Sequence, residues 1–235
     1  MIEKLSGGAM GKIFLVKLKS TGRLYIMKKL DYFDKKDKQR ADDEIEHLRR
    51  LSSNYTVKLV WAFEDHTEMH LITEYCSRGD LRKVIKELQQ LQEEYRIQIV
   101  WEIFAQIVIE LNFMHSKGVL HRDIKPENIF IMEDGLVKLG DLGLAKVIQG
   151  NNKATVAGTK IYIAPEVWRD NKMDFGSDLY AVGICIYELI TGKHPFAAKS
   201  ENDMIQRMKN GQPRELPDYV PTELKELILS LLNVV

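Results

Sequence analysis

The sequence has little cysteine, no excess of either charge and no long apolar run. Only two cysteines, Cys76 and Cys185, occur in 235 residues, which argues against a disulfide framework and favours a reducing compartment. Lys plus Arg and Asp plus Glu both number 34, so the charge balance indicates neither nucleic acid nor a membrane surface as a partner. The longest apolar run, 181–187, is too short to span a bilayer, and the N-terminus lacks the apolar core of a signal peptide. We therefore expect a soluble cytoplasmic protein, with the cytoskeleton or the nucleus as alternative locations.

Strand patterns dominate the first third of the chain, which contains no repeats or low-complexity tracts. Between the strand patterns, Ala41, Ile45, Leu48 and Leu51 recur at helical spacing and predict one helix. Alternating apolar and polar residues predict strands over 2–19 (two strands joined by a glycine turn), 23–30, 57–65 and 69–75.

The rest of the chain has mainly helical periodicity. The segment 178–190 is apolar nearly all round and predicts a buried central helix. We therefore predict an α+β fold with a strand-rich lobe (1–73), a connector (74–79), a helical lobe (80–235) and a cleft between the lobes. Apolar residues over 94–117 also predict a core helix through Ile97, Val100, Trp101, Phe104, Ile107, Val108, Leu111 and Met114.

A glycine-rich turn near the N-terminus is a candidate phosphate-binding loop. Glycines let backbone N–H groups approach a ligand closely, and Gly7, Gly8 and Gly11 lie together in SGGAMG. The motif of P-loop nucleotidases does not fit, because only three residues separate Gly7 from Gly11 and Ile13 follows the lysine. Taken alone, such a hairpin is more often only a turn.

Two further motifs give the chain its chemistry. Residues 121–128 read HRDIKPEN, and 140–143 read GDLG. Together with the glycine turn, Lys28 and the APE triplet at 164–166, they resemble the eukaryotic protein kinase family in order and spacing. The resemblance implies a bilobal protein kinase fold, ATP and Mg²⁺ as cofactors, and transfer of the γ-phosphoryl group to a protein hydroxyl.

The resemblance also implies the catalytic roles. Asp123 takes the position of the base that accepts the substrate proton, and Lys125 lies against the transferring phosphoryl group. Lys28 grips the α- and β-phosphates. Its carboxylate partner is Glu44 or Glu46, and Glu44 is preferred because Leu48 then takes the family's buried position four residues on. Lys125 paired with Thr159 is typical of serine/threonine kinases.

The nucleotide and metal sites follow from the same resemblance. Asn128 and Asp141 offer oxygen ligands to Mg²⁺, which prefers hard oxygen donors. Two departures occur, because Ser6 replaces the first glycine of the kinase loop and Ile26 replaces the usual alanine above adenine. The implied ATP-binding residues are Leu5, Gly8, Gly11, Ile13, Ile26, Lys28, Thr73, Glu74, Cys76, Asp80 and Phe130.

The finer family and the regulation are also implied by resemblance. HRDIKPENIF, KLGDLGLAK and AGTKIYIAPE are most similar to the NIMA-related serine/threonine kinases. Thr155 is then the activating phosphosite, modified by an upstream kinase or by the chain itself, with Arg122 as the partner of the phosphate. Asp178 is expected to brace the catalytic loop, which is the HRDIKPEN motif at 121–128.

Two alternatives remain open from the sequence. The departures at Ser6 and Ile26 fit a pseudokinase that acts as an ATP-binding or scaffolding module. The resemblance implies an arginine partner for Glu166 on a further helix beyond 221–235, so we expect a trimmed domain. We expect a monomer, or a weak dimer formed by exchange of the activation segment, which runs from Asp141 to Glu166. The expected partners of the active enzyme are ATP and proteins with Ser or Thr acceptors.

Overall fold

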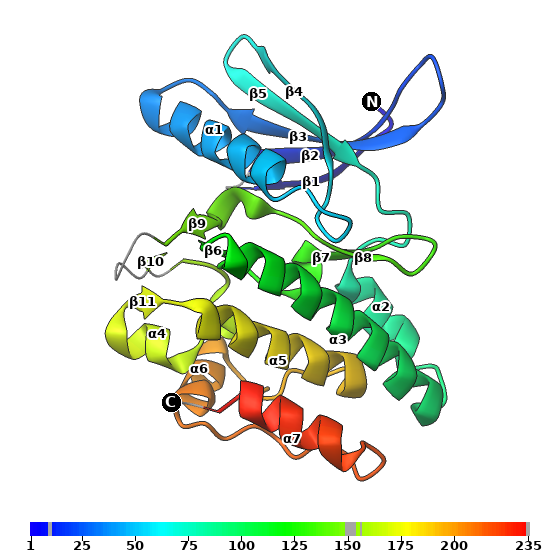
Figure 1. Ribbon diagram of the computed structural model, residues 1–235, viewed down its shortest axis with the longest axis vertical. Helices are drawn as coiled ribbons and strands as arrows, with labels where there is room; N and C mark the ends of the chain where they lie inside the picture. The colour runs from blue at the N-terminus through cyan, green and yellow to red at the C-terminus, as the bar shows by residue number, and fades with distance from the viewer. Residues whose placement is uncertain (9–10, 149–153, 156, 234–235) are drawn as a thin grey trace.

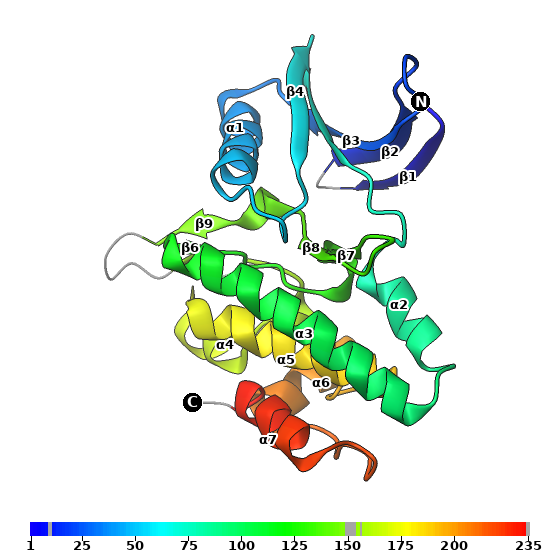
Figure 2. The same cartoon turned by 45° about the vertical axis from the view of Figure 1, so that its right-hand side comes forward.

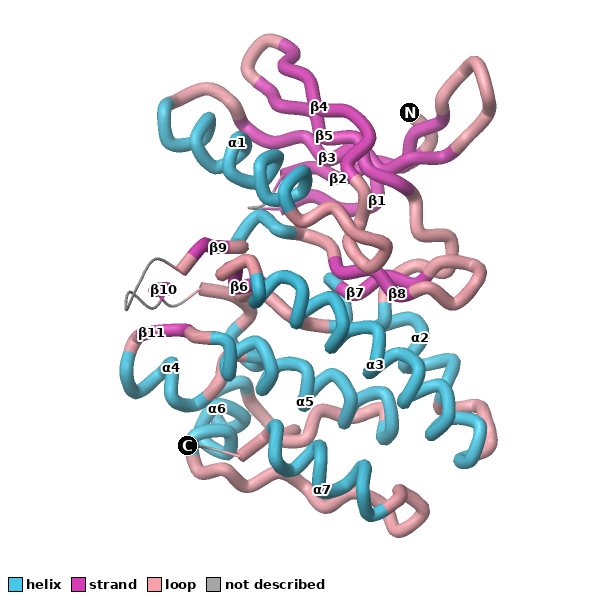
Figure 3. The backbone as a smooth tube through the Cα atoms, in the orientation of Figure 1, coloured by secondary structure: helices cyan, strands magenta, loops and turns pink. Residues whose placement is uncertain are grey.

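The strands gather at one end of the molecule and the helices at the other. The computed structural model describes residues 1–8, 11–148, 154–155 and 157–233, with side chains left undescribed at 6–8 and 154–155. Figure 3 shows the strands of the first third above a helical part that contains only short strands. This arrangement confirms the predicted α+β fold.

The N-terminal strands form one five-stranded sheet in the order β1-β2-β3-β5-β4, and every neighbouring pair is antiparallel. Ile26 of β3 lies opposite Thr73 of β5, and Ile13 of β2 lies opposite Lys28 of β3. The register therefore brings predicted ATP-binding residues onto adjacent strands. The strands are β1 (Glu3–Gly8), β2 (Gly11–Lys17), β3 (Leu24–Asp31), β4 (Leu59–Asp65) and β5 (Glu68–Glu74).

Helix α1 (Lys35–Arg50) packs against this sheet (Figure 1). It begins after Asp34, whose carboxylate accepts hydrogen bonds from the backbone N–H groups of Lys36 and Asp37, both at 2.8 Å. The predicted apolar face is buried at Ala41, Ile45, Leu48 and Leu51. Glu44, which lies beside this face, is buried as well.

The C-terminal part is built around α5 (Phe175–Thr191), which contacts α2, α3 and α7. Asp174 and Ser177 form a capping box that starts the helix. From Ser177 to Ile190 every residue but Leu179 is buried, as the apolar run predicts. The other helices are α2 (Leu81–Leu88), α3 (Glu93–Ser116), α4 (Pro165–Asp170), α6 (Glu201–Lys209) and α7 (Thr222–Leu231).

Pairs of short strands lie in the segments that connect these helices. The hairpin β7–β8 lies under the sheet (Figure 2), with Gly135 at its turn in the left-handed region at φ 84°. An Asp-Gly pair between two apolar runs favours such a turn, and here it is Asp134-Gly135. The short strands are β6 (Val119–Leu120), β7 (Ile129–Ile131), β8 (Val137–Leu139), β9 (Lys146–Val147), β10 (Ala154–Thr155) and β11 (Lys172–Met173).

Helix α3 is less buried than its sequence predicts. Trp101 was expected in the core, but it is 37% exposed, and Phe104 and Val108 are only partly buried. The reason is that the apolar residues of α3 are not confined to one face, while its contacts are with β6, β8 and α5. By length and composition it is the one helix of the described residues that could cross a membrane, and 33% of its most apolar window is buried.

Candidate active site

The catalytic loop is held by a buried carboxylate of α5. Asp178 accepts hydrogen bonds from the backbone N–H groups of His121 and Arg122, each at 2.9 Å, and its Oδ2 lies 3.0 Å from Nε2 of His115. Arg122 has a φ of 72°, which a non-glycine residue adopts only at a cost of about 1–3 kcal/mol. The Asp178 contacts therefore fix a strained backbone, and the predicted bracing role is confirmed.

Asp123 collects donors from three other residues. Its Oδ2 lies 2.8 Å from Lys125 Nζ and accepts a hydrogen bond from Asn128 Nδ2 at 2.9 Å. Its Oδ1 accepts hydrogen bonds from the backbone N–H of Thr159 at 2.9 Å and from the Thr159 hydroxyl at 2.8 Å. Burial raises the pKa of Asp123, but Lys125 and Thr159 outweigh it and lower the pKa below its usual value. Asp123 is therefore an ionised, oriented carboxylate at neutral pH.

Thr159 reaches Asp123 because the preceding residue is glycine. Gly158 has a φ of 107°, and a Cβ there would come 2.3 Å from the backbone oxygen of Arg122. Only glycine lets the activation segment approach the catalytic loop this closely. Lys125 Nζ then donates to the Thr159 hydroxyl oxygen at 2.9 Å, so the two residues that resemblance paired are in direct contact.

Lys28 joins the sheet to the helical part. Its ammonium lies 2.8 Å from Glu44 of α1 and 2.9 Å from Asp141, which follows β8. Burial lowers the pKa of Lys28, but these two carboxylates outweigh it and raise the pKa above its usual value. Glu46, the alternative partner, is exposed. The ammonium is therefore charged, oriented and placed beside the loop that carries Asp141.

Asn128 and Asp141 have the chemistry to hold Mg²⁺. The amide nitrogen of Asn128 donates to the backbone oxygen and to Oδ2 of Asp123, at 2.8 and 2.9 Å, which leaves the Asn128 amide oxygen for a cation. Asp141 is 25% exposed and uses Oδ1 for Lys28. Among the described residues no group of three or more His, Cys, Asp and Glu side chains could hold a metal alone. A cation here would therefore take further ligands from phosphate and water.

The predicted ATP-binding residues lie on β1, β2, β3, β5 and β7 and in the connector that leads to α2. Gly11 has a φ of 105°, and a Cβ there would come 2.3 Å from the backbone oxygen of Lys29. Asp80 caps α2 through Lys83 N at 3.0 Å and bridges to Phe130. Leu5 is 47% exposed. The side chains of Ser6 and Thr155 lie outside the described side chains.

The side chains of the connector residues Glu74 and Cys76 face into the protein. Glu74 Oε1 lies 2.8 Å from Lys138 Nζ and accepts a hydrogen bond from the backbone N–H of Lys58 at 2.8 Å. Cys76 is buried, and burial raises the pKa of its thiol to about 12. A nucleotide would therefore meet the backbone of these two residues.

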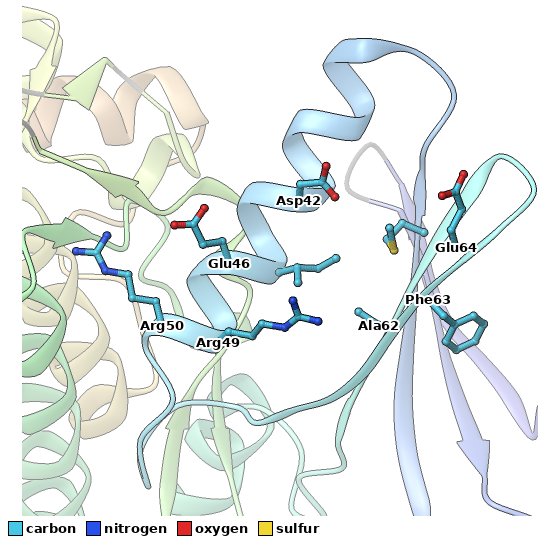
Figure 4. A pocket seen from close by; sticks show the side chains of 9 residues that line it. Asp42, Glu46, Arg49, Arg50, Ala62, Phe63 and Glu64 are labelled. Carbon is cyan, nitrogen blue, oxygen red and sulfur yellow. The ribbon is translucent and has the colours of Figure 1, made fainter.

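A hollow of about 820 Å³ lies on another part of the molecule, between α1 and the strands β4 and β5 (Figure 4). None of the predicted site residues lines it. Its walls carry both signs of charge, with Asp42, Glu46 and Arg49 on α1 and Glu64 on β4. The predicted catalytic residues therefore lie around Asp123 and Lys28 and not in this hollow.

Comparison with known sequences identifies the arrangement. A model of the protein kinase domain matches residues 1–235. The chain belongs to the protein kinase family. It is 34% identical to serine/threonine-protein kinase Nek4 of Mus musculus, over 96% of this chain and 29% of that protein. It is 33% identical to G2-specific protein kinase nimA of Emericella nidulans, over 100% of this chain and 38% of that protein.

These similarities confirm the predicted resemblance to the NIMA-related kinases. Mouse Nek1 adds a third relative, 31% identical over 98% of this kinase chain and 19% of its own length. The chain thus spans well under half of the length of each of these relatives.

One feature of the kinase domain was missed by the sequence reasoning. Arg82 of α2 donates to Glu127 of the HRDIKPEN motif and to Glu188 of α5. Glu127 stands in the motif and was visible, but its partner lies 45 residues away. No local pattern of a single sequence pairs residues at that separation.

Proposed function

We propose that this kinase domain transfers the γ-phosphoryl group of Mg²⁺-bound ATP to serine or threonine hydroxyls of proteins. The observation that carries the proposal is Asp123, ionised and held at hydrogen-bonding distance from Lys125, Asn128 and Thr159. The printed names of its relatives, serine/threonine-protein kinases among them, support the same acceptor class.

The residues have separable tasks in this reaction. When bound, ATP would supply the phosphoryl group, and Mg²⁺ would offset the negative charge of the phosphates. Asp123 orients the acceptor hydroxyl and takes its proton, while Lys125 offsets negative charge at the acceptor. A lowered pKa makes Asp123 a weak base, which suits a loose transition state in which positioning matters more than proton removal. Lys28 would hold the non-transferred phosphates, and Asn128 and Asp141 would hold the cation.

The test compares wild-type protein with Asp123→Asn in transfer of phosphate from ATP to casein, with Mg²⁺. The variant keeps the size of the side chain but loses the carboxylate, so we expect transfer to fall by about 10²-fold or more. ATP affinity, measured by thermal stabilisation, is expected to stay unchanged. Equal transfer by both proteins contradicts the role of Asp123. ATP binding without transfer in the wild type favours a scaffolding module. The pairing of Lys28 with Asp141 supports the active enzyme instead.

The state of the activation segment is part of the proposal. A phosphate at Thr155 adds about −1.5 to −2 charge, which an arginine can bind and so order the segment. Mass spectrometry of the active protein is expected to find Thr155 modified. Full activity with unmodified Thr155 contradicts this switch.

A further inference from the structure

A second ionic cluster borders the acceptor site. Arg82 of α2 donates through Nε to Glu127 at 2.8 Å, through Nη1 to Glu188 at 3.0 Å and through Nη2 to the Tyr162 hydroxyl. The Tyr162 hydroxyl in turn donates to Glu188 at 2.9 Å. One guanidinium thus ties together two carboxylates and a phenol.

The cluster joins the two segments that hold the catalytic residues. Glu127 lies in the turn Pro126–Asn128, between Lys125 and Asn128, which both contact Asp123. Tyr162 ends the turn Lys160–Tyr162, which directly follows Thr159. An extended substrate advances only about 3.3 Å per residue, so residues close to the acceptor serine pass these segments.

The cluster has a buried end and an exposed end. The Glu188 side chain is 5% exposed, whereas those of Arg82 and Glu127 are 34% and 45% exposed. Two carboxylates share one cation, so loss of Arg82 would leave two negative charges beside the acceptor site. Glu127, the more exposed of the two, would then bind an arginine side chain of a substrate through charge-assisted hydrogen bonds. In the wild type that place is taken by Arg82, and displacing it would strand the buried carboxylate of Glu188.

We propose that Arg82 determines substrate specificity by occupying, from within the chain, an acidic subsite that would otherwise select a basic substrate residue. The wild-type enzyme then accepts peptides without a requirement for arginine at the position that faces Glu127. The inference rests on the proposed function, because it concerns the peptide that the same site phosphorylates.

The test measures binding and phosphorylation of serine peptides in which a single arginine is moved through each position of a neutral background. The variant is Arg82→Gln combined with Glu188→Gln, which removes the cation and neutralises the buried carboxylate so that the fold is kept. Fluorescence anisotropy is expected to show about tenfold tighter binding for arginine at one position, as a charge-assisted hydrogen-bonded pair provides. The wild type is expected to show no such gain, and adding Glu127→Gln is expected to abolish it.

Several results overturn the proposal. They are an unchanged ranking of peptides in the folded double variant, an equal arginine preference in the wild type, and a gain that survives Glu127→Gln. Arg78→Gln is the matched control, because it removes a nearby exposed cation paired with Glu87 at 3.3 Å and should leave the ranking unchanged. Binding needs no phosphate transfer, so a shifted binding preference without transfer contradicts only the proposed function. Transfer with an unshifted preference contradicts only the role of Arg82.

Discussion

Two cations of this kinase domain each lie between two carboxylates, and their surroundings differ. Lys28 takes Glu44 from α1 and Asp141 from the loop after β8, so its contacts join the sheet to the helical part. Arg82 takes Glu127 and Glu188 from the helical part alone. An ammonium is a compact charge that can exchange partners, whereas a guanidinium fixes several acceptors in one plane. The Lys28 cluster is therefore suited to ligand binding, and the Arg82 cluster is suited to bracing the catalytic segments and selecting the peptide substrate.

Replacing Lys28 is the strongest way to separate the two clusters. Lys28→Met removes the charge that would meet the phosphates, so we expect phosphate transfer to fall by about 10²–10³-fold. Arg82→Gln with Glu188→Gln should keep transfer to a neutral peptide within about threefold, because it touches no reacting group. Steady-state kinetics with one peptide measure both.

The control for this comparison is Lys29→Met. Lys29 neighbours Lys28 on β3 but pairs with Glu68, at 2.8 Å. The Lys29→Met variant should retain nearly the full rate of phosphate transfer. If Lys28→Met keeps more than about a tenth of the wild-type rate, the phosphate-binding role of Lys28 is wrong.

The second prediction concerns the neutral residue beside the Arg82 cluster. His194 donates from Nε2 to the backbone oxygen of Ile161 at 2.9 Å, and its Nδ1 accepts from Phe196 N at 3.2 Å. Protonation of Nδ1 would remove the acceptor of the hydrogen bond from Phe196 N. Burial, together with the charge of Arg82, lowers the pKa of His194 to about 4, although the Ile161 contact opposes this.

The sign of the pH dependence follows from this shift. Between pH 4 and about 6.5 the unfolded chain binds more protons at His194 than the folded chain does, so the free energy of unfolding rises with pH. From pH 7 to pH 5 this residue should remove about 2 kcal/mol of stability. Urea unfolding of His194→Gln should show a pH dependence that is smaller by about that amount. An identical dependence in both proteins would mean that His194 is already charged in the fold.

The third prediction measures the coupling inside the Arg82 cluster. Arg82→Gln alone leaves the buried Glu188 without its cation and should destabilise the fold by about 2–3 kcal/mol. Glu188→Gln should restore most of this loss, which gives a coupling energy of about 1–2 kcal/mol in a double-mutant cycle. Strictly additive effects on urea unfolding would show that the pair contributes no coupling.

The residues of the two clusters also show what a single sequence can predict. The resemblance to the kinase family prefers Glu44 to Glu46 because Leu48 then takes the family's buried position four residues on, and Glu44 is the residue that Lys28 contacts. The family pattern, applied to a short local spacing, sufficed there. Arg82 was missed because its partners are 45 and 106 residues away, so only the packing of α2 against the turn Pro126–Asn128 and against α5 brings them together.

The same limit explains the success with α5 and the error at α3. A helix that is apolar all round and buried all round, like α5, needs no choice of face. Trp101 lies on a helix whose apolar residues are also spread around its axis but which has neighbours on only part of its surface. Hydrophobic periodicity cannot tell which side of such a helix will be covered, because that depends on elements far away in the chain.

The smallest expected effect tests whether burial, rather than charge, distinguishes the clusters from ordinary ion pairs. Arg78 and Glu87 lie near Arg82 and pair at 3.3 Å, but their side chains are 47% and 46% exposed. Water and salt screen such a pair, so Arg78→Ala should change the free energy of unfolding by less than about 0.5–1 kcal/mol. Raising the salt concentration should reduce even this difference in urea unfolding, while the Arg82–Glu188 coupling, with one partner buried, should persist. If the two pairs respond equally to salt, burial of Glu188 does not protect its pair, and the contrast between the clusters loses its physical basis.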